Sequence, residues 1–343
     1  MENKYDVVIV GAGISGLECA TILADSELSV LVIDKIKESD LGNKVCANGI
    51  FKEDLHYINK EFTNSDFQSV LLKFGKKEAI FPLNEKLITT IDRPKLLQSI
   101  LKKVRQSTNV EVIFEESILK IKDGEVETRS GQTIGYKYLV GADGSNSLVR
   151  RFLKLPEESD KYAAAIQYLI PEMKGGFKVI FDPKLIPTGY IWYFPWKNQM
   201  SIGCGVDRKS KKVKDLKEKF TNWLKSQNIN LDKAVFQGHT IRYGYAGYKF
   251  GNIFLAGDAA GLASGLTGKG IFAAFLSGQQ IGLEILGENK DNLIEKWLIK
   301  KQKQEKFLKY LKNPITARLA IDSGFALLKL NNDKINQKII RNI

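Results

Sequence analysis

The stretch YDVVIVGAGISG, residues 5–16, decides the fold class of this chain. Its first half is a run of apolar residues, which is typical of a strand buried in a parallel sheet. Gly11, Gly13 and Gly16 follow in the spacing GxGxxG, and the residues after them have the apolar spacing of a helix. In this context the first glycine permits a tight turn, the second lets a pyrophosphate approach the backbone, and the third lets helix and strand pack closely.

A second apolar strand, LSVLVID, completes a βαβ unit and ends at Asp34. An acidic residue about 20 positions after the glycines is placed to accept hydrogen bonds from an adenosine ribose. Strand, glycines, helix and acid together predict a dinucleotide site, and a tight turn without a ligand is the alternative. The pattern does not distinguish FAD from NAD.

The rest of the chain predicts an α/β fold with an insertion. Apolar strands return to the first sheet after about residue 138 and again at 252–258, whereas the strands between them are rich in aromatic residues. We expect a Rossmann-like dinucleotide-binding domain, an inserted antiparallel-sheet substrate domain and C-terminal helices. The dinucleotide-binding domain is expected over 1–154 and 244–290. The substrate domain is expected over 155–243, and the C-terminal helices over 291–343. Within the first range, local patterns predict a short helix over 51–60 and a strand over 68–74.

Composition narrows the class of protein. With 43% hydrophobic residues the chain can bury a core, which argues against wholesale disorder. Its three cysteines are far apart, so a disulfide framework is not expected, and the two histidines have no zinc-site spacing. No metal site is therefore expected. Because neither a signal peptide nor a long apolar run is found, we expect a cytoplasmic chain. We also expect a monomer.

The net charge of +13 is concentrated in two lysine-rich stretches, 207–220 and 295–313. A solvated basic surface is the simplest interpretation. The alternative is attraction to anionic lipid headgroups, at the inner membrane face, or to a polyanionic substrate, because clustered lysines bind anionic surfaces. Nucleic acid is not an expected partner, since no nucleic-acid module accompanies the charge.

Two later motifs point to FAD. VGADGSNSLVRR (140–151) and NIFLAGDAAGLASGLTGKGI (252–271) resemble the two additional FAD motifs of the p-hydroxybenzoate hydroxylase superfamily. Asp258 follows an apolar strand at the carboxyl edge of the sheet, where it can accept hydrogen bonds from ribityl hydroxyls, or it is a helix N-cap. Asp143 is a second cofactor-binding candidate or a structural turn acid.

The resemblance implies further cofactor contacts. Arg93, in IDRPKLL, matches the arginine of this superfamily that usually reaches the flavin, and a plain surface arginine is the alternative. Gly268, Gly270 and Ile271 lie in the glycine-rich segment whose backbone would pass close to a flat ring.

Two stretches resemble the geranylgeranyl reductase family within that superfamily. KVCANGI (44–50) is similar to the K-x-C-G-G-G segment of these enzymes, and YIWYFP (190–195) is similar to their Y-x-W-x-F-P motif. By this resemblance Lys44, Cys46 and Ala47 would lie near the flavin. Cys46 would be catalytic, by contacting substrate or helping to deliver a proton, or it would be a small residue that fills a tight loop.

The aromatic strand suits a lipid substrate. In an extended segment Tyr190, Trp192 and Phe194 point to one face, which could line a long apolar tunnel, and ordinary sheet core is the alternative. The chain departs from the family where Ala47 and Asn48 replace glycines and where Lys269 replaces a glutamate.

The resemblance therefore implies an FAD-dependent reductase of carbon–carbon double bonds in a prenyl lipid of the geranylgeranyl type. NAD(P)H or a ferredoxin would reduce the flavin again. Two alternatives remain open: a flavin-dependent monooxygenase or halogenase of the same superfamily, and a flavin electron carrier at a membrane surface without substrate chemistry of its own.

Overall fold

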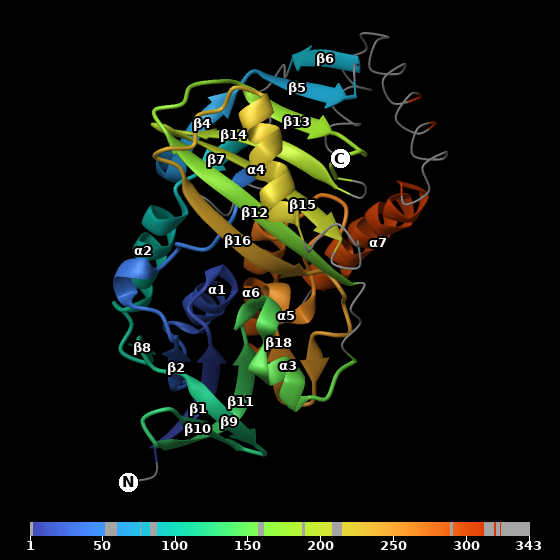
Figure 1. Ribbon diagram of the computed structural model, residues 1–343. Helices are drawn as coiled ribbons and strands as arrows, with labels where there is room; N and C mark the ends of the chain where they lie inside the picture. The colour runs from blue at the N-terminus through green and yellow to red at the C-terminus, as the bar shows by residue number, and fades with distance from the viewer. Residues whose placement is uncertain are drawn as a thin grey trace.

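The first sheet of the molecule has a parallel centre built around β1 (Figure 1). The structure is a computed structural model, which describes residues 3–51, 60–75, 77–82, 88–156, 161–186, 189–207, 215–288, 291–311, 319 and 323. The strands of the first sheet follow one another in the order β17 (Lys249–Phe250), β18 (Ile253–Leu255), β11 (Thr133–Gly141), β1 (Asn3–Val10), β2 (Val30–Ile33) and β8 (Val110–Ile113). A hairpin of β9 (Ile118–Lys122) and β10 (Glu125–Thr128) extends β11. The central position of β1 explains why its apolar run is fully buried.

Two helices on one side of this sheet pack through glycines. α1 (Ile14–Leu23) contacts α6 (Ile271–Leu286), and Gly278 and Gly282 of α6 lie at the contact. A side-chain carbon on Gly278 would lie 2.4 Å from the carbonyl oxygen of Ser15. The backbones of the two helices therefore approach more closely than any side chain would allow.

Four further helices of the described chain contact α1, α6 or β11. They are α2 (Arg93–Val104), α3 (Leu148–Phe152), α5 (Gly257–Ala260) and α7 (Leu293–Leu311). Short 3-10 turns span η1 (Glu38–Asp40), η3 (Lys60–Phe62) and η4 (Gly144–Asn146). None of the described helices has both the length and the apolar character needed to cross a membrane.

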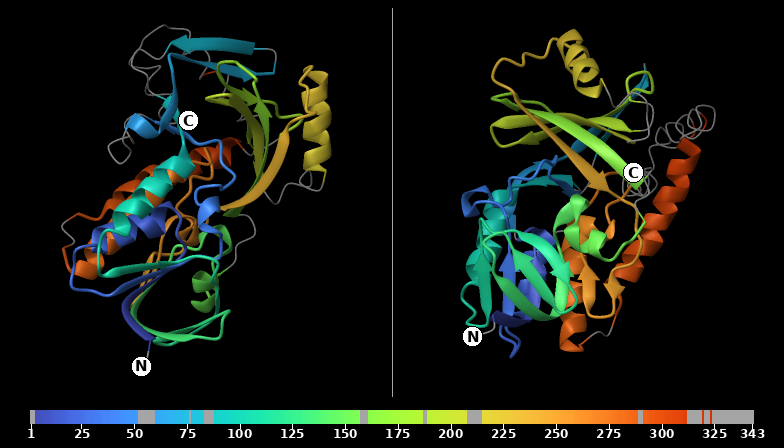
Figure 2. Two further views of the ribbon diagram at one scale, coloured as in Figure 1. Left: turned by 90° about the vertical axis from the view of Figure 1, so that its left-hand side faces the viewer. Right: turned by 60° about the horizontal axis from the view of Figure 1, so that its bottom comes forward.

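The second sheet forms a layer of its own above the first domain, with α4 (Leu216–Ser226) on its outer face (Figure 2). Its strand order is β16 (Val235–Arg242), β12 (Tyr162–Pro171), β15 (Gln199–Asp207), β14 (Tyr190–Trp196), β13 (Phe177–Phe181), β5 (Ser69–Phe74) and β6 (Lys77–Pro82). A small third sheet joins β3 (Gly49–Phe51), β7 (Ile88–Ile91) and β4 (Thr63–Phe67).

The structure corrects three sequence expectations. The second sheet is not purely antiparallel, because β13 pairs with β5 in parallel. β5 and β6 lie within the predicted range 1–154 but belong to the second sheet. The helix predicted over 51–60 is wrong at its described ends, where Phe51 belongs to strand β3 and residue 60 begins the turn η3, and residues 52–59 lie outside the described residues.

The two faces of the second sheet differ as the alternation predicts. Ile191 and Tyr193 pack with Phe220 of α4 in one hydrophobic cluster. Tyr190 and Phe194 contact the first domain on the opposite face, through Thr267 and Gly49. The aromatic motif therefore faces the glycine-rich segments.

We predict that Gly278→Ala destabilises the protein. Alanine gains about 1 kcal/mol of helix propensity over glycine. Forcing a methyl group against the Ser15 carbonyl should cost about 1–3 kcal/mol, and more if the helices cannot separate. Thermal denaturation should show a lower melting temperature than wild type. Gly176→Ala, in an exposed loop where a side-chain carbon meets nothing within 4 Å, is the matched control; an unchanged melting temperature for Gly278→Ala would contradict the expectation.

Candidate functional site

The turn after β1 has the geometry that the fingerprint predicts. Gly11 has φ 108°, and a side-chain carbon there would lie 2.5 Å from the carbonyl oxygen of Ala142. A side-chain carbon on Gly16 would lie 1.9 Å from the Gly11 oxygen, whereas Gly13 has nothing within 4 Å. Two glycines thus serve packing, and the third leaves open space over the backbone, which suits a pyrophosphate.

Asp34 lies beside this turn. Its Oδ2 accepts a hydrogen bond of 2.7 Å from the Ala12 amide, and its Oδ1 accepts one of 3.2 Å from the Ile36 amide. The carboxylate is therefore held at the carboxyl edge of the sheet, next to the glycines. The residues present fit the adenosine and pyrophosphate portions of FAD.

Lys44 and Asp258 form an ion pair that connects two motifs far apart in the sequence. The Lys44 ammonium lies 2.7 Å from Asp258 Oδ2, which also accepts a hydrogen bond of 3.2 Å from Ser145. Burial, the largest single effect, would raise the pKa of Asp258, but the Lys44 ammonium together with His239 and Ser145 lowers it on balance. The N-cap of α5 is Ala256, so the side chain of Asp258 does not serve as the N-cap.

The loop that carries Cys46 lies against the second sheet. Asn48, where the family has glycine, adopts φ 54°, a left-handed conformation that asparagine tolerates. Its amide donates a hydrogen bond of 3.3 Å to Cys46 Sγ, and its own Oδ1 is buried with no hydrogen-bond partner among the described residues. The Ala47 carbonyl accepts a hydrogen bond of 3.0 Å from the Trp196 indole. Asn48 therefore preserves the turn that a glycine would make.

Arg93 and Asp143 are both buried but differ in their contacts. Arg93 is 7% exposed at the first position of α2, so it is not a plain surface arginine, and its Nε has no hydrogen-bond partner in the described part of the chain. Asp143 Oδ2 accepts hydrogen bonds from the Leu148 and Val149 amides, at 2.6 and 3.3 Å. Burial raises the pKa of Asp143. Oδ2 of Asp143 thus accepts two amides of its own turn, whereas its buried Oδ1 has no hydrogen-bond partner in the described structure.

A row of paired residues crosses the inner face of the second sheet. Strand register places Tyr190 opposite Gly205, Gly205 opposite Ala165, and Ala165 opposite His239. Directly opposed residues share a face. A side-chain carbon on Gly205 would meet nothing within 4 Å. Small residues and open space therefore lie between the tyrosine ring and the imidazole.

Trp192 and Phe194 are held by packing more than Tyr190 is. Trp192 lies over Gly203, and its indole donates a hydrogen bond of 3.0 Å to Ser201. The Phe194 ring stacks on Phe177 with centroids 3.9 Å apart. Phe194 thus packs as an ordinary residue of the sheet core, which is the alternative interpretation, whereas Tyr190 lies beside the open space over Gly205.

His239 is a site residue that sequence reasoning missed. Its Nε2 is buried with no hydrogen-bond partner among the described residues. Burial and the Lys44 charge lower its pKa to about 4, against a smaller opposing effect of Asp258. A single histidine in an alternating strand gives no local signal, and only strand register places it in the Tyr190 row.

The glycine-rich segment before α6 completes the site. Gly268 has φ 67°, Gly270 is the N-cap of α6, and Ile271 is its first residue. The Lys269 ammonium lies 3.6 Å from the centroid of the Phe51 ring, a cation–π contact. Among the described residues, no group of three His, Cys, Asp or Glu side chains could hold a metal ion.

Comparison with known sequences agrees with this geometry. Residues 100–293 match the family model described as FAD binding domain, and residues 5–170 match the model described as pyridine nucleotide-disulphide oxidoreductase. A digeranylgeranylglycerophospholipid reductase of Methanococcus vannielii is 25% identical, with 98% of this chain and 90% of the relative covered. An uncharacterised protein of Methanosarcina barkeri is 29% identical, with 90% and 82% covered.

Solved structures show the fold. A geranylgeranyl bacteriochlorophyll reductase-like protein of Thermoplasma acidophilum superposes with a TM-score of 0.82 at 19% identity, covering 100% of this chain and 96% of that protein. The p-nitrophenol 4-monooxygenase of Pseudomonas putida superposes with a TM-score of 0.74 at 15% identity, covering 99% and 98%. The predicted fold of the p-hydroxybenzoate hydroxylase superfamily is confirmed. The chain belongs to the FAD binding domain family and is an FAD-dependent oxidoreductase similar to geranylgeranyl reductases.

Proposed function

We propose that this protein reduces carbon–carbon double bonds of a prenyl lipid of the geranylgeranyl type. The observation that carries the proposal is the open space over Gly205, bordered by Tyr190 and facing the glycine-rich segment before α6. An isoprenoid chain is bound by apolar area rather than by hydrogen bonds. This face supplies apolar area. The name of the Methanococcus vannielii relative supports the same substrate class.

FAD would be held along the carboxyl edge of the first sheet. When bound, it supplies hydride chemistry. We propose that the turn of Gly11, Gly13 and Gly16 and the carboxylate of Asp34 bind the adenosine and pyrophosphate end. The flavin end would be held by the residues that converge from the other motifs: Lys44, Cys46, Ala47, Arg93, Asp143, Asp258, Gly268, Gly270 and Ile271.

Cys46 is the proposed proton donor to the alkene. Burial and the nearby Cys46 raise the pKa of Tyr190, so its hydroxyl stays protonated, and it donates to the Thr267 carbonyl at 2.5 Å. Because the Tyr190 proton is already donated to the Thr267 carbonyl, we assign Tyr190 the role of orienting the substrate rather than protonating it. The half-buried thiol of Cys46 lies in the loop that faces the same sheet and remains to deliver the proton.

His239 borders the same space as a neutral side chain. With a pKa of about 4, it carries no charge near pH 7. We propose that it closes the polar end of the substrate space without placing a charge beside the lipid, since a buried unpaired charge is costly.

Reductant, location and assembly are also part of the proposal. NAD(P)H or a ferredoxin would reduce the flavin, and the protein would act in the cytoplasm as a monomer. Exposed lysines of α4, among them Lys217 and Lys219, would attract the anionic inner face of the membrane that holds the substrate.

We predict that Gly205→Leu abolishes lipid reduction while FAD binding persists. A leucine would fill the space over β15 and exclude an isoprenoid chain. Its Cβ would have no other protein atom within 4 Å, so the substitution should not disturb the sheet. Mass spectrometry of geranylgeranyl lipids, incubated anaerobically with reductant, measures the loss, and flavin fluorescence measures binding. Gly176→Leu is the exposed control.

The wild-type arm of this assay separates the alternatives. Saturated lipid formed without oxygen supports the reductase. If the wild type instead hydroxylates or halogenates a substrate and consumes oxygen in proportion, the monooxygenase or halogenase alternative replaces the proposal. Flavin turnover with an electron acceptor and no lipid product would indicate an electron carrier.

Removing the thiol should slow reduction without loss of cofactor. We expect Cys46→Ala and Cys46→Ser to lower the rate of alkene reduction roughly 100-fold or more, the usual size of general acid catalysis. Single-turnover reoxidation of the flavin by lipid measures the rate, and the flavin spectrum reports on binding. Full activity in both variants would assign Cys46 a packing role.

Acid should destabilise the protein through His239. The unfolded chain has the ordinary histidine pKa near 6.5, so it binds more protons than the folded protein as the pH falls from about 6.5 towards 4. Glu18 acts in the opposite direction over the same window, because burial raises its pKa to about 7. The quantity to measure is therefore the free energy of unfolding of wild type minus that of His239→Asn, which should fall as urea denaturation is repeated from about pH 6.5 towards pH 4. Thr240→Ser, a neighbour that does not titrate, should keep the wild-type slope; an unchanged slope in His239→Asn rules the assignment out.

A further inference from the structure

Helix α7 buries three polar side chains on one face. Trp297, Lys301 and Gln304 are spaced four and three residues apart, so they line one side of the helix. They are 4%, 2% and 4% exposed, whereas Ile299 is 58% exposed. A helix that buries polar groups and exposes an isoleucine is not arranged for hydrophobic packing alone, and each buried polar group needs a partner.

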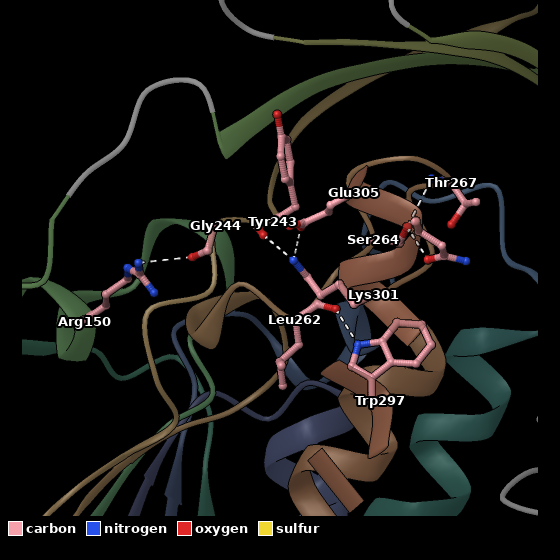
Figure 3. Close-up of polar contacts among 10 residues, drawn as sticks. Arg150, Tyr243, Gly244, Leu262, Ser264, Thr267, Trp297, Lys301 and Glu305 are labelled. Carbon is pink, nitrogen blue, oxygen red and sulfur yellow. Dashed lines mark hydrogen bonds and ion pairs between the residues drawn. The ribbon is translucent and has the colours of Figure 1, made fainter. Parts of the chain in front are cut away.

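Two of these partners are backbone carbonyls next to the glycine-rich segment (Figure 3). The Trp297 indole donates a hydrogen bond of 2.8 Å to the Leu262 carbonyl, and the Lys301 ammonium donates one of 2.7 Å to the Tyr243 carbonyl. Lys301 also pairs with Glu305 one turn later on the same helix. α7 thus binds the main chain of two segments that approach the flavin site.

The third partner is a side chain within the glycine-rich segment. The Ser264 hydroxyl donates a hydrogen bond of 2.8 Å to Gln304 Oε1 and accepts one of 3.3 Å from the Thr267 amide. The Thr267 carbonyl then accepts the Tyr190 hydroxyl at 2.5 Å. Four hydrogen-bonding residues therefore connect α7 to the substrate face of the second sheet.

The segment between Ser264 and Thr267 is a turn closed by two backbone hydrogen bonds of 2.9 Å, from the Gly268 amide to the Ser264 carbonyl and from the Ser264 amide to the Lys269 carbonyl. It belongs to no helix or strand, and Gly265 packs against the ring of Tyr243, where a side-chain carbon would lie 2.7 Å away. Ser264 and Thr267 are nearly inaccessible, so water does not readily replace a lost hydrogen bond there. The bond between Ser264 and Gln304 therefore connects the turn that carries the Thr267 carbonyl to α7.

We propose that Gln304 and Ser264 are positioning residues, which hold the Thr267 carbonyl where it orients the Tyr190 ring beside the substrate space. The role rests on the proposed function, since it deepens the substrate site of that reductase. α7 begins at Leu293, the last residue matched by the FAD binding domain model. A helix that lies almost entirely outside the matched range therefore positions a part of the site. Gln304 therefore sets how tightly a substrate is held by acting through Ser264, Thr267 and Tyr190.

Fluorine NMR on the full-length, FAD-loaded protein tests this without substrate. The protein is labelled with 3-fluorotyrosine, and the Tyr190 resonance is identified by its absence in Tyr190→Phe. Gln304→Leu and Ser264→Ala should each shift that resonance beyond its linewidth, because the hydroxyl loses a fixed acceptor. Lys303→Leu, one residue before Gln304 on the exposed face, should leave it in place.

Kinetics provides a second readout. In lipid reduction, Gln304→Leu should raise KM about fivefold, the size of one net hydrogen bond, with kcat changed less than twofold. In a Tyr190→Phe background the same substitution should add nothing to KM, because the residue through which it acts has lost its hydroxyl.

The two readouts fail differently. An unmoved Tyr190 resonance in folded Gln304→Leu and Ser264→Ala overturns the positioning role, whatever the substrate is. Additive effects on KM in the double variant also overturn it. A wild-type protein inactive on prenyl lipids overturns the proposed function alone, because the NMR result does not depend on that activity.

Discussion

The close approach of backbone to backbone at the first turn is the constraint on which the rest of the site depends. Gly16 packs on the Gly11 carbonyl, and Gly11 packs on Ala142 at the end of β11. Because neither glycine has a side chain, α1 begins directly at the edge where β1, β2 and β11 end side by side. The acidic residues that follow these strands, and the open backbone at Gly13, are brought to one edge as a result.

The inserted sheet completes this edge rather than forming a separate site. Trp196 donates to the loop of Cys46, and Tyr190 donates to the segment before α6. Both aromatic residues lie on the strand whose other face packs on α4. The same strand thus packs on α4 with one set of side chains and contacts the loop of Cys46 and the segment before α6 with the other, which is what period-two alternation permits.

Local pattern predicted the parts of the fold whose geometry is local. The βαβ unit, α2 and the aromatic strands follow from glycine spacing, helical periodicity and alternation. The helix expected over 51–60 was wrong where it is described, and β5 and β6 joined the second sheet. Strand pairing depends on which edge is free to accept a strand, and short sequence patterns do not contain that information. The sequence did not predict His239 as a site residue for the same reason: only the strand register places it in one row with Ala165, Gly205 and Tyr190.

By itself the sequence determined the glycine turn, the acid at the end of β2, the alternating face of Tyr190 and Trp192, and the resemblance to geranylgeranyl reductases. These features need only short-range sterics and periodicity. Tertiary structure alone decided which remote groups meet: Lys44 with Asp258, 214 residues apart, and Gln304 with Ser264. Such pairs form because sheets and helices pack as units, so a side chain finds its partner through the placement of whole elements rather than through its neighbours in the chain.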